Sequence, residues 1–205
     1  MATLALALLF AQSADFETLY RQFAGPRDLA LYLAHRGDFD KAAPYLKQVI
    51  ETPGGGLPEA RAMHNWAVAL EERSPESAAQ LYAKALDIRA KALPPFDPDL
   101  ATTRLNLAGL NLETGEPLAR LALEAFEKSL GPRHERTAAA CGTLGAALAV
   151  KGDVAGAERM FRRALTIKET PAALENLADL LTQTGRAAAA RPLLDRAKAI
   201  RARAR

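Results

Sequence analysis

Cysteine is nearly absent from this sequence of 205 residues, and its single occurrence, Cys141, has two consequences. One cysteine excludes an intramolecular disulfide, and it leaves no cysteine pair that could hold a structural zinc ion. Aromatic residues are also scarce, at 6%, and valine and isoleucine are few. Alanine and leucine dominate instead, which is a helix-forming composition with little material for strands.

Long apolar runs are absent too, because no stretch approaches the about 20 apolar residues that a membrane-spanning helix needs. The apolar run Leu4–Phe10 is followed by the small residues Ala11–Ser13, and residues 1–14 resemble a short secretory signal peptide. No lysine or arginine precedes the run, which departs from that pattern. We favour an exported or periplasmic protein over a cytoplasmic one. The alternative is that residues 1–14 are an apolar segment that packs on the next helix.

A strong excess of charge of one sign is also missing. The formal net charge is +3 and the isoelectric point is near 9.1, and much of the basic excess lies in the C-terminal segment Arg196–Arg205. Arginines at alternate positions do not form one stripe on a helix, and no aromatic residue is interleaved with them. Weak nucleic-acid binding through this basic end is therefore the alternative function, and a solvated helix end is the simpler interpretation.

The chain does contain an internal repeat. Five residues that break helical runs are each preceded, nine positions earlier, by a similar triplet such as Asn-Leu-Ala, and both markers are spaced 37, 41, 37 and 33 residues apart. The breaking residues are Gly37, Ser74, Gly115, Gly152 and Gly185, and the triplets begin at Asp28, Asn65, Asn106, Thr143 and Asn176. Two independent markers that keep one phase over five copies indicate a repeat protein.

Each copy has the pattern of an antiparallel helix pair. The first helix carries a large apolar residue, a small residue and then a leucine one turn later, so one face is apolar. The hinge glycine favours the left-handed conformation that ends a helix, and Ser74–Pro75 ends one helix and caps the next. The third copy departs from this pattern, with Asn111 in place of the leucine, and its second helix is expected at Pro117–Leu130 after a hinge at Gly115.

These residues resemble the tetratricopeptide repeat, and the longer copies are most similar to its kinesin-light-chain type. The resemblance implies an all-α, right-handed α-solenoid of about five helix-turn-helix hairpins in a single domain, 15–205. The expected repeats span residues 24–52, 59–92, 100–131, 137–169 and 171–205, and Asp15–Ala24 is a candidate capping helix. The resemblance also implies that the first helices line a concave groove for a peptide or a partner protein.

No constellation of catalytic or metal-binding residues is found in the sequence. His35, His64 and His134 belong to different repeats, without the spacing of paired ligands. Cys141 lies among alanines and is expected to be a buried packing thiol. Gly54–Gly56 lacks the lysine and hydroxyl residue of a phosphate loop. We expect no enzyme activity, no cofactor and no metal.

If the groove exists, its central residues are expected to be Asn65, Asn106 and Asn176, which lead three of the triplets. A primary amide offers donors and an acceptor, so it can bind an extended peptide backbone, although these side chains could equally cap or bridge adjacent repeats. Further candidates on the same face are Arg61, Val68, Glu72, Thr102, Glu113, Thr143 and Asp179. The floor between Gly109 and Ala146 is small and uncharged, and acids flank it.

The sequence thus predicts a non-catalytic protein-protein interaction scaffold, with homo-oligomerisation as one form of partnership. Its partner is expected to have an apolar middle and some basic character, because the floor of the groove is small and uncharged and both of its flanks carry acids.

Overall fold

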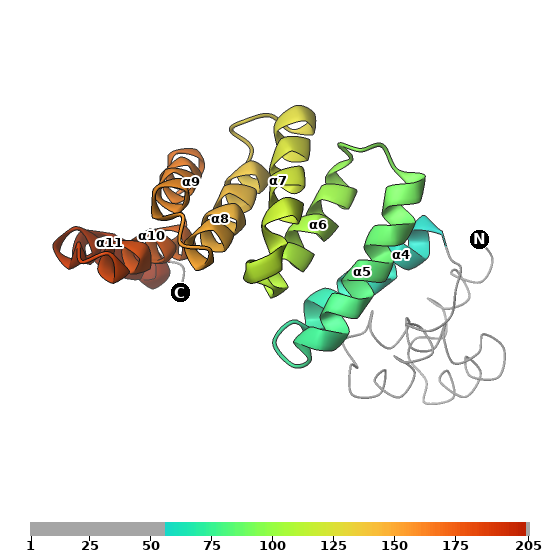
Figure 1. The fold of residues 1–205 in the computed structure, drawn as a ribbon, viewed down its shortest axis with the longest axis horizontal. Coiled ribbons are helices and arrows are strands. Elements are labelled where there is room, and N and C mark those ends of the chain that lie inside the picture. The colour runs from blue at the N-terminus through green and yellow to red at the C-terminus, as the bar shows by residue number, and fades with distance from the viewer. Residues whose placement is uncertain (1–55, 204–205) are drawn as a thin grey trace. The chain divides into compact units, whose positions relative to one another are not determined.

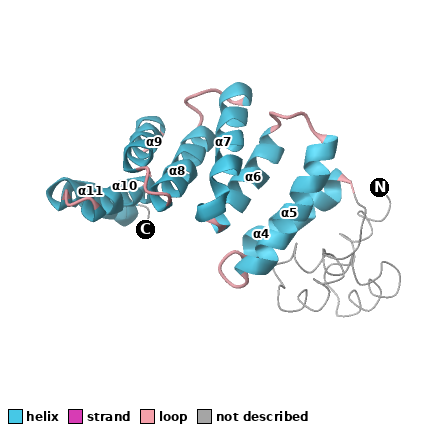
Figure 2. Ribbon diagram, in the orientation of Figure 1, coloured by secondary structure: helices cyan, strands magenta, loops and turns pink. Residues whose placement is uncertain are grey.

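The computed structural model describes residues 56–203 of the chain, and every regular element among them is an α-helix (Figure 2). The expectations for residues 1–14, for Asp15–Ala24 and for the first repeat, 24–52, lie outside these residues. The chain divides into two compact units, Met1–Ile88 and Arg89–Arg205. The first contains α4 (Leu57–Leu70) and most of α5 (Pro75–Ala92).

The second unit contains three helix pairs. They are α6 (Pro98–Leu110) with α7 (Leu112–Ser129), α8 (Glu135–Val150) with α9 (Val154–Ile167), and α10 (Pro171–Gln183) with α11 (Ala187–Arg203). Each pair is a hairpin, and α7 packs on α8 as α9 packs on α10, so successive hairpins stack (Figure 1). The described chain is therefore an all-α helical-repeat solenoid, as the sequence predicts.

The apolar residues of the repeat form the core in the expected register. In α8, Leu144, Gly145 and Leu148 are buried. Leu144 and Leu148 belong to one hydrophobic cluster with Ala157 and Phe161 of α9, and Gly145 lies against the ring of Phe161. The equivalent buried residues are Trp66, Ala67 and Leu70 in α4 and Leu177, Ala178 and Leu181 in α10. Because most buried positions on the facing helices are alanines, the helices approach closely and each contributes little apolar area. Stability then depends on stacking against the next hairpin.

Polar residues directly before the helices set where they begin. Asp97 accepts hydrogen bonds from the backbone amides of Asp99 and Leu100 at 2.8 and 3.3 Å, and Pro98 occupies the first turn. Side chains in the same position cap the next four helices: Asn111, His134, Asp153 and Thr170. Each cap satisfies an amide that has no partner within its own helix.

Three of the predicted hinges are confirmed. Gly152 and Gly185 have φ angles of 81° and 78°, in the left-handed region that favours glycine. Helix α5 begins at Pro75, and the Ser74 hydroxyl donates a hydrogen bond to the Ser77 hydroxyl at 2.8 Å. Ser74 thus stabilises the first turn of α5 through its hydrogen bond to the Ser77 side chain.

The predicted hinge of the third copy is wrong. The chain turns at Asn111, whose side chain accepts a hydrogen bond from the Thr114 amide at 3.3 Å and so caps α7. Gly115 lies inside α7, where a Cβ would meet the carbonyl oxygen of Ala108 at 2.3 Å. Glycine is needed at this position because α6 and α7 touch there. Pro117 also lies inside α7. The second helix of this pair therefore starts five residues before the expected Pro117.

Two glutamates connect consecutive pairs of helices in the same way. Glu116 of α7 accepts a hydrogen bond at 2.7 Å from Lys151, which follows α8. Glu158 of α9 accepts one at 2.8 Å from Arg186, which precedes α11. Each glutamate is also paired with an arginine one turn later on its own helix. These ion pairs add polar contacts between hairpins at the rim of the apolar core.

One buried charge holds the start of α6 to the end of α5. Arg89 is 4% exposed and donates a hydrogen bond to the carbonyl oxygen of Asp99 at 2.7 Å. It also donates to the hydroxyl of Thr103. A guanidinium that is removed from water needs such acceptors, so this contact fixes the N-terminal end of the second unit.

Candidate functional site

The first helices of the three pairs in the second unit are neighbours, because α8 contacts both α6 and α10. Their partly exposed faces carry five of the residues predicted for a groove. Thr102, Asn106, Thr143 and Asn176 are half-buried, and Asp179 is exposed. The repeat pattern therefore brings these residues onto three adjacent helices, with Thr143 at the centre.

A hollow of about 470 Å³ lies on this face between α8 and α10. Residues from the first half of α8, the end of α9 and the start of α10 line it. They include Ala139, Gly142, Thr143, Ala164, Ala172 and Asn176. Thr143 and Asn176, which start equivalent triplets of consecutive repeats, thus share one site. Their place in the repeat made the pairing predictable, but the hollow itself depends on the distance between two helices.

The polar groups of Thr143 and Asn176 make no hydrogen bond within residues 56–203. This is unusual for threonine in these helices, since the hydroxyls of Thr102 and Thr182 donate to the carbonyl four residues earlier at 2.7 and 2.8 Å. Asn176 therefore does not bridge adjacent repeats through described residues. Both groups are available to a molecule that enters the hollow.

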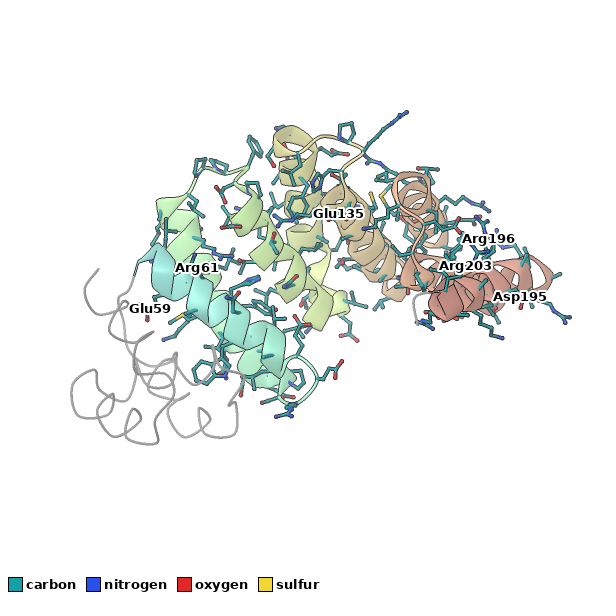
Figure 3. All side chains as sticks on the ribbon, turned by 180° about the vertical axis from the view of Figure 1, so that it is seen from behind. Glu59, Arg61, Glu135, Asp195, Arg196 and Arg203 are labelled. Atoms are coloured by element: carbon teal, nitrogen blue, oxygen red, sulfur yellow. The ribbon has the colours of Figure 1, made fainter. Side chains whose placement is uncertain are left out.

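Charges around the hollow are largely paired. Glu135 lies at the start of α8 (Figure 3). It forms an ion pair with Lys168 at 2.5 Å, and the hydrogen bond from Lys168 lowers the pKa of Glu135. On α10, Glu175 accepts two hydrogen bonds from Arg201, at 2.5 and 2.8 Å. Arg136 is the third charged residue that lines the hollow, and the other residues that line it are uncharged.

The predicted residues of the first unit lie on α4. Arg61 is exposed on this helix (Figure 3). Asn65 and Val68 follow at helical spacing and are exposed as well, Val68 to 47%. Glu72 is exposed as well, but it lies just beyond the last residue of α4. These residues form a helix face of their own in this unit.

Glu113 is not where the sequence places it. It was expected on the first helix of the third pair, beside Thr102 and Asn106. Because the chain turns at Asn111, Glu113 is the second residue of α7 and is exposed in its first turn. It therefore belongs to the turn between the two helices of that pair.

The described residues contain no group of three or more His, Cys, Asp and Glu side chains that could hold a metal ion. Cys141 is buried, and burial raises the pKa of its thiol. His64 is buried edge-on against Tyr82, and His134 caps α8 by accepting a hydrogen bond from the Arg136 amide at 3.0 Å. Each of these groups has a structural role.

Between residues 56 and 203, no helix has the length and apolar character needed to cross a membrane. The basic end of the chain is partly neutralised, since Arg196 pairs with Glu169 and Arg201 with Glu175. Nothing in these contacts favours the nucleic-acid alternative.

Stacked hairpins with a shared first-helix face define a class of protein, the helical-repeat solenoids. Residues 137–170 and 172–204 match the tetratricopeptide repeat family. This part of the chain therefore consists of tetratricopeptide repeats, as the motifs in its sequence predict, and the fold is similar to that of kinesin-light-chain-like repeat structures. No curated protein matches the sequence.

Several solved structures share the fold. BtubC (BKLC) from P. vanneervenii is 25% identical, with a TM-score of 0.67 over 97% of this chain and 85% of that one. A kinesin-light-chain candidate from Podosopora anserina with nearly identical TPR-like repeats is 19% identical, with a TM-score of 0.65 over 94% of this chain and 99% of that one. MamA from Desulfovibrio magneticus RS-1 is 16% identical, with a TM-score of 0.57 over 90% and 94%.

Proposed function

We propose that the protein is a non-catalytic scaffold that binds an extended segment of a protein partner along the face shared by its first helices. In the second unit this face is formed by α6, α8 and α10. The observation that carries the proposal is the pair of unbonded polar groups in the hollow, the Thr143 hydroxyl and the Asn176 amide.

These two groups match the chemistry of a peptide backbone. An extended segment presents an amide donor and a carbonyl acceptor at each residue, and both must find partners when they leave water. The amide of Asn176 can serve both, and the hydroxyl of Thr143 can donate or accept. Recognition of this kind demands little of the partner's side chains, so specificity depends on the rest of the face.

The test is a selection of random linear peptides on the immobilised full chain, followed by fluorescence-anisotropy titration of the enriched peptides. Removal of both groups by Thr143→Ala and Asn176→Ala should weaken binding about tenfold, because two hydrogen bonds of about 0.5–1.5 kcal/mol each are lost. The helicity and melting temperature should stay near those of the unchanged protein, since neither group bonds within the described chain.

A matched control removes the same two chemical groups elsewhere. Thr166 is exposed on α9, and Gln80 is exposed on α5. Thr166→Ala with Gln80→Ala should leave peptide affinity unchanged. Equal binding by the Thr143/Asn176 variant and the unchanged protein would place the site elsewhere, and failure to enrich any peptide would refute the proposed function.

A further inference from the structure

For most glycines inside the described helices, a close contact with another part of the chain explains why no larger residue fits. A Cβ at Gly115 would meet the backbone of Ala108 at 2.3 Å, and one at Gly145 would meet the ring of Phe161 at 2.7 Å. A Cβ at Gly156 would meet the capping carboxylate of Asp153 at 2.1 Å. At these positions a larger residue would separate elements that now touch.

Gly109 and Gly142 differ, because an added Cβ at either position would meet nothing within 4 Å. Neither has a positive φ, so the backbone does not require glycine. Gly109 is the second-to-last residue of α6, next to the turn at Asn111, where helical order is ending anyway. Gly142 is the eighth of the sixteen residues of α8. Glycine in a helix interior is less stable than alanine, and no contact within the described chain offsets that cost at Gly142.

Gly142 lies in the wall of the hollow, between Ala139 and Thr143. The absent side chain leaves the backbone of α8 open at the centre of the face, beside the two unbonded polar groups. Glycine is typical of places where another backbone must approach closely. Of the three charged residues that line the hollow, Glu135 and Lys168 pair with each other, and Arg136 is the third.

We propose that Gly142 is the point of closest approach of the bound segment, and that it selects a residue with a small side chain. This inference rests on the proposed function and names the occupant: an extended stretch of a protein partner with glycine, alanine or serine opposite Gly142. A side chain at position 142 would fill the space that the backbone of this segment occupies.

The experiment uses the peptides enriched on the unchanged full chain. Sequencing should show a common position that holds glycine, alanine or serine. Binding of these peptides to Gly142→Leu should be weakened about tenfold or more, because the new side chain occupies their place. The matched control is Ala188→Leu, which adds a leucine side chain at an exposed position of α11 that does not line the hollow, and it should bind as the unchanged protein does.

Gly142→Ala adds only a methyl group and keeps the test valid if the leucine variant folds poorly. It should melt at or above the temperature of the unchanged protein and still bind the peptides less tightly. Enriched peptides that bind Gly142→Ala and Gly142→Leu as tightly as the unchanged protein would overturn this inference alone. The inference is also wrong if Ala188→Leu weakens binding as much as Gly142→Leu does, or if the enriched peptides share no small residue.

Discussion

Replacement of Gly115 by alanine should destabilise the protein, although alanine is the better helix former. The new Cβ would lie 2.3 Å from the carbonyl oxygen of Ala108 and 2.8 Å from its Cα atom. Ordinary contact begins at 3.4 Å, so α6 and α7 would have to move apart by about 1.1 Å (3.4 − 2.3) at this point. The neighbouring atoms belong to the backbone and cannot rotate away as a side chain can.

The expected loss of stability is the difference between two opposing effects of the Gly115→Ala substitution. Alanine regains about 1 kcal/mol of helix propensity, whereas overpacking a close contact costs about 1–3 kcal/mol and more when backbone must shift. A net loss of about 2 kcal/mol corresponds to a fall of about 4–8 °C in the melting temperature for a chain of this size. Thermal unfolding of the full chain, followed by far-ultraviolet circular dichroism, measures it.

Gly142→Ala is the control for this prediction, because it is the same substitution in a helix of the next hairpin, with open space around the new methyl group. It should raise the free energy of unfolding by up to about 1 kcal/mol. If Gly115→Ala melts at or above the temperature of the unchanged protein, close contact between α6 and α7 is not the reason for that glycine.

Three further predictions concern buried and paired groups. Cys141 should react slowly with a thiol reagent in the native protein and rapidly in denaturant, because it is buried and its pKa is raised, and rapid native labelling would contradict this. The hydrogen bond from Arg186 lowers the pKa of Glu158 below its ordinary value of 4.5. The ionised Glu158 side chain therefore stabilises the fold above pH 4.5, and this stabilisation is lost as the pH falls through the pKa that Glu158 has in the folded protein. The difference in melting temperature between Glu158→Gln and the unchanged protein should therefore be present at neutral pH and vanish in acid, and a difference that persists in acid would exclude the ion pair as its cause. Arg89→Met should lower the free energy of unfolding in urea by about 2 kcal/mol, because two acceptors lose a charged donor. Arg159→Met, at an exposed position on α9, should lower it little. Equal effects of the two substitutions would refute the role of Arg89.

Much of the architecture was predictable because it depends on local patterns. A large apolar residue, a small one and a leucine one turn later place one face of each first helix in the core, as at Leu144, Gly145 and Leu148. Glycine after such a run ends the helix, as Gly152 and Gly185 do. The predicted face was also placed largely by phase, since Thr143 and Asn176 start equivalent triplets and line one hollow.

The third pair shows where local patterns fail. Glycine is suited both to a turn and to a close contact between helices, and only the position of Ala108 across from Gly115 decides between the two. Asn111, which interrupts the leucine pattern, is the residue that ends α6 and caps α7. The turn lies at residue 111 and not at residue 115, four residues earlier than expected. Glu113 therefore belongs to the second helix of the pair and not to the first.

The amino-acid sequence by itself determined the repeat, its phase and the helical nature of each half-repeat, because these depend on residues within a turn or two of each other. Tertiary structure alone decided the hollow between α8 and α10, the unbonded state of its two polar groups and the open space at Gly142. These depend on the distance between helices of different repeats, which is set by the packing of many alanines and glycines at once and by no single motif.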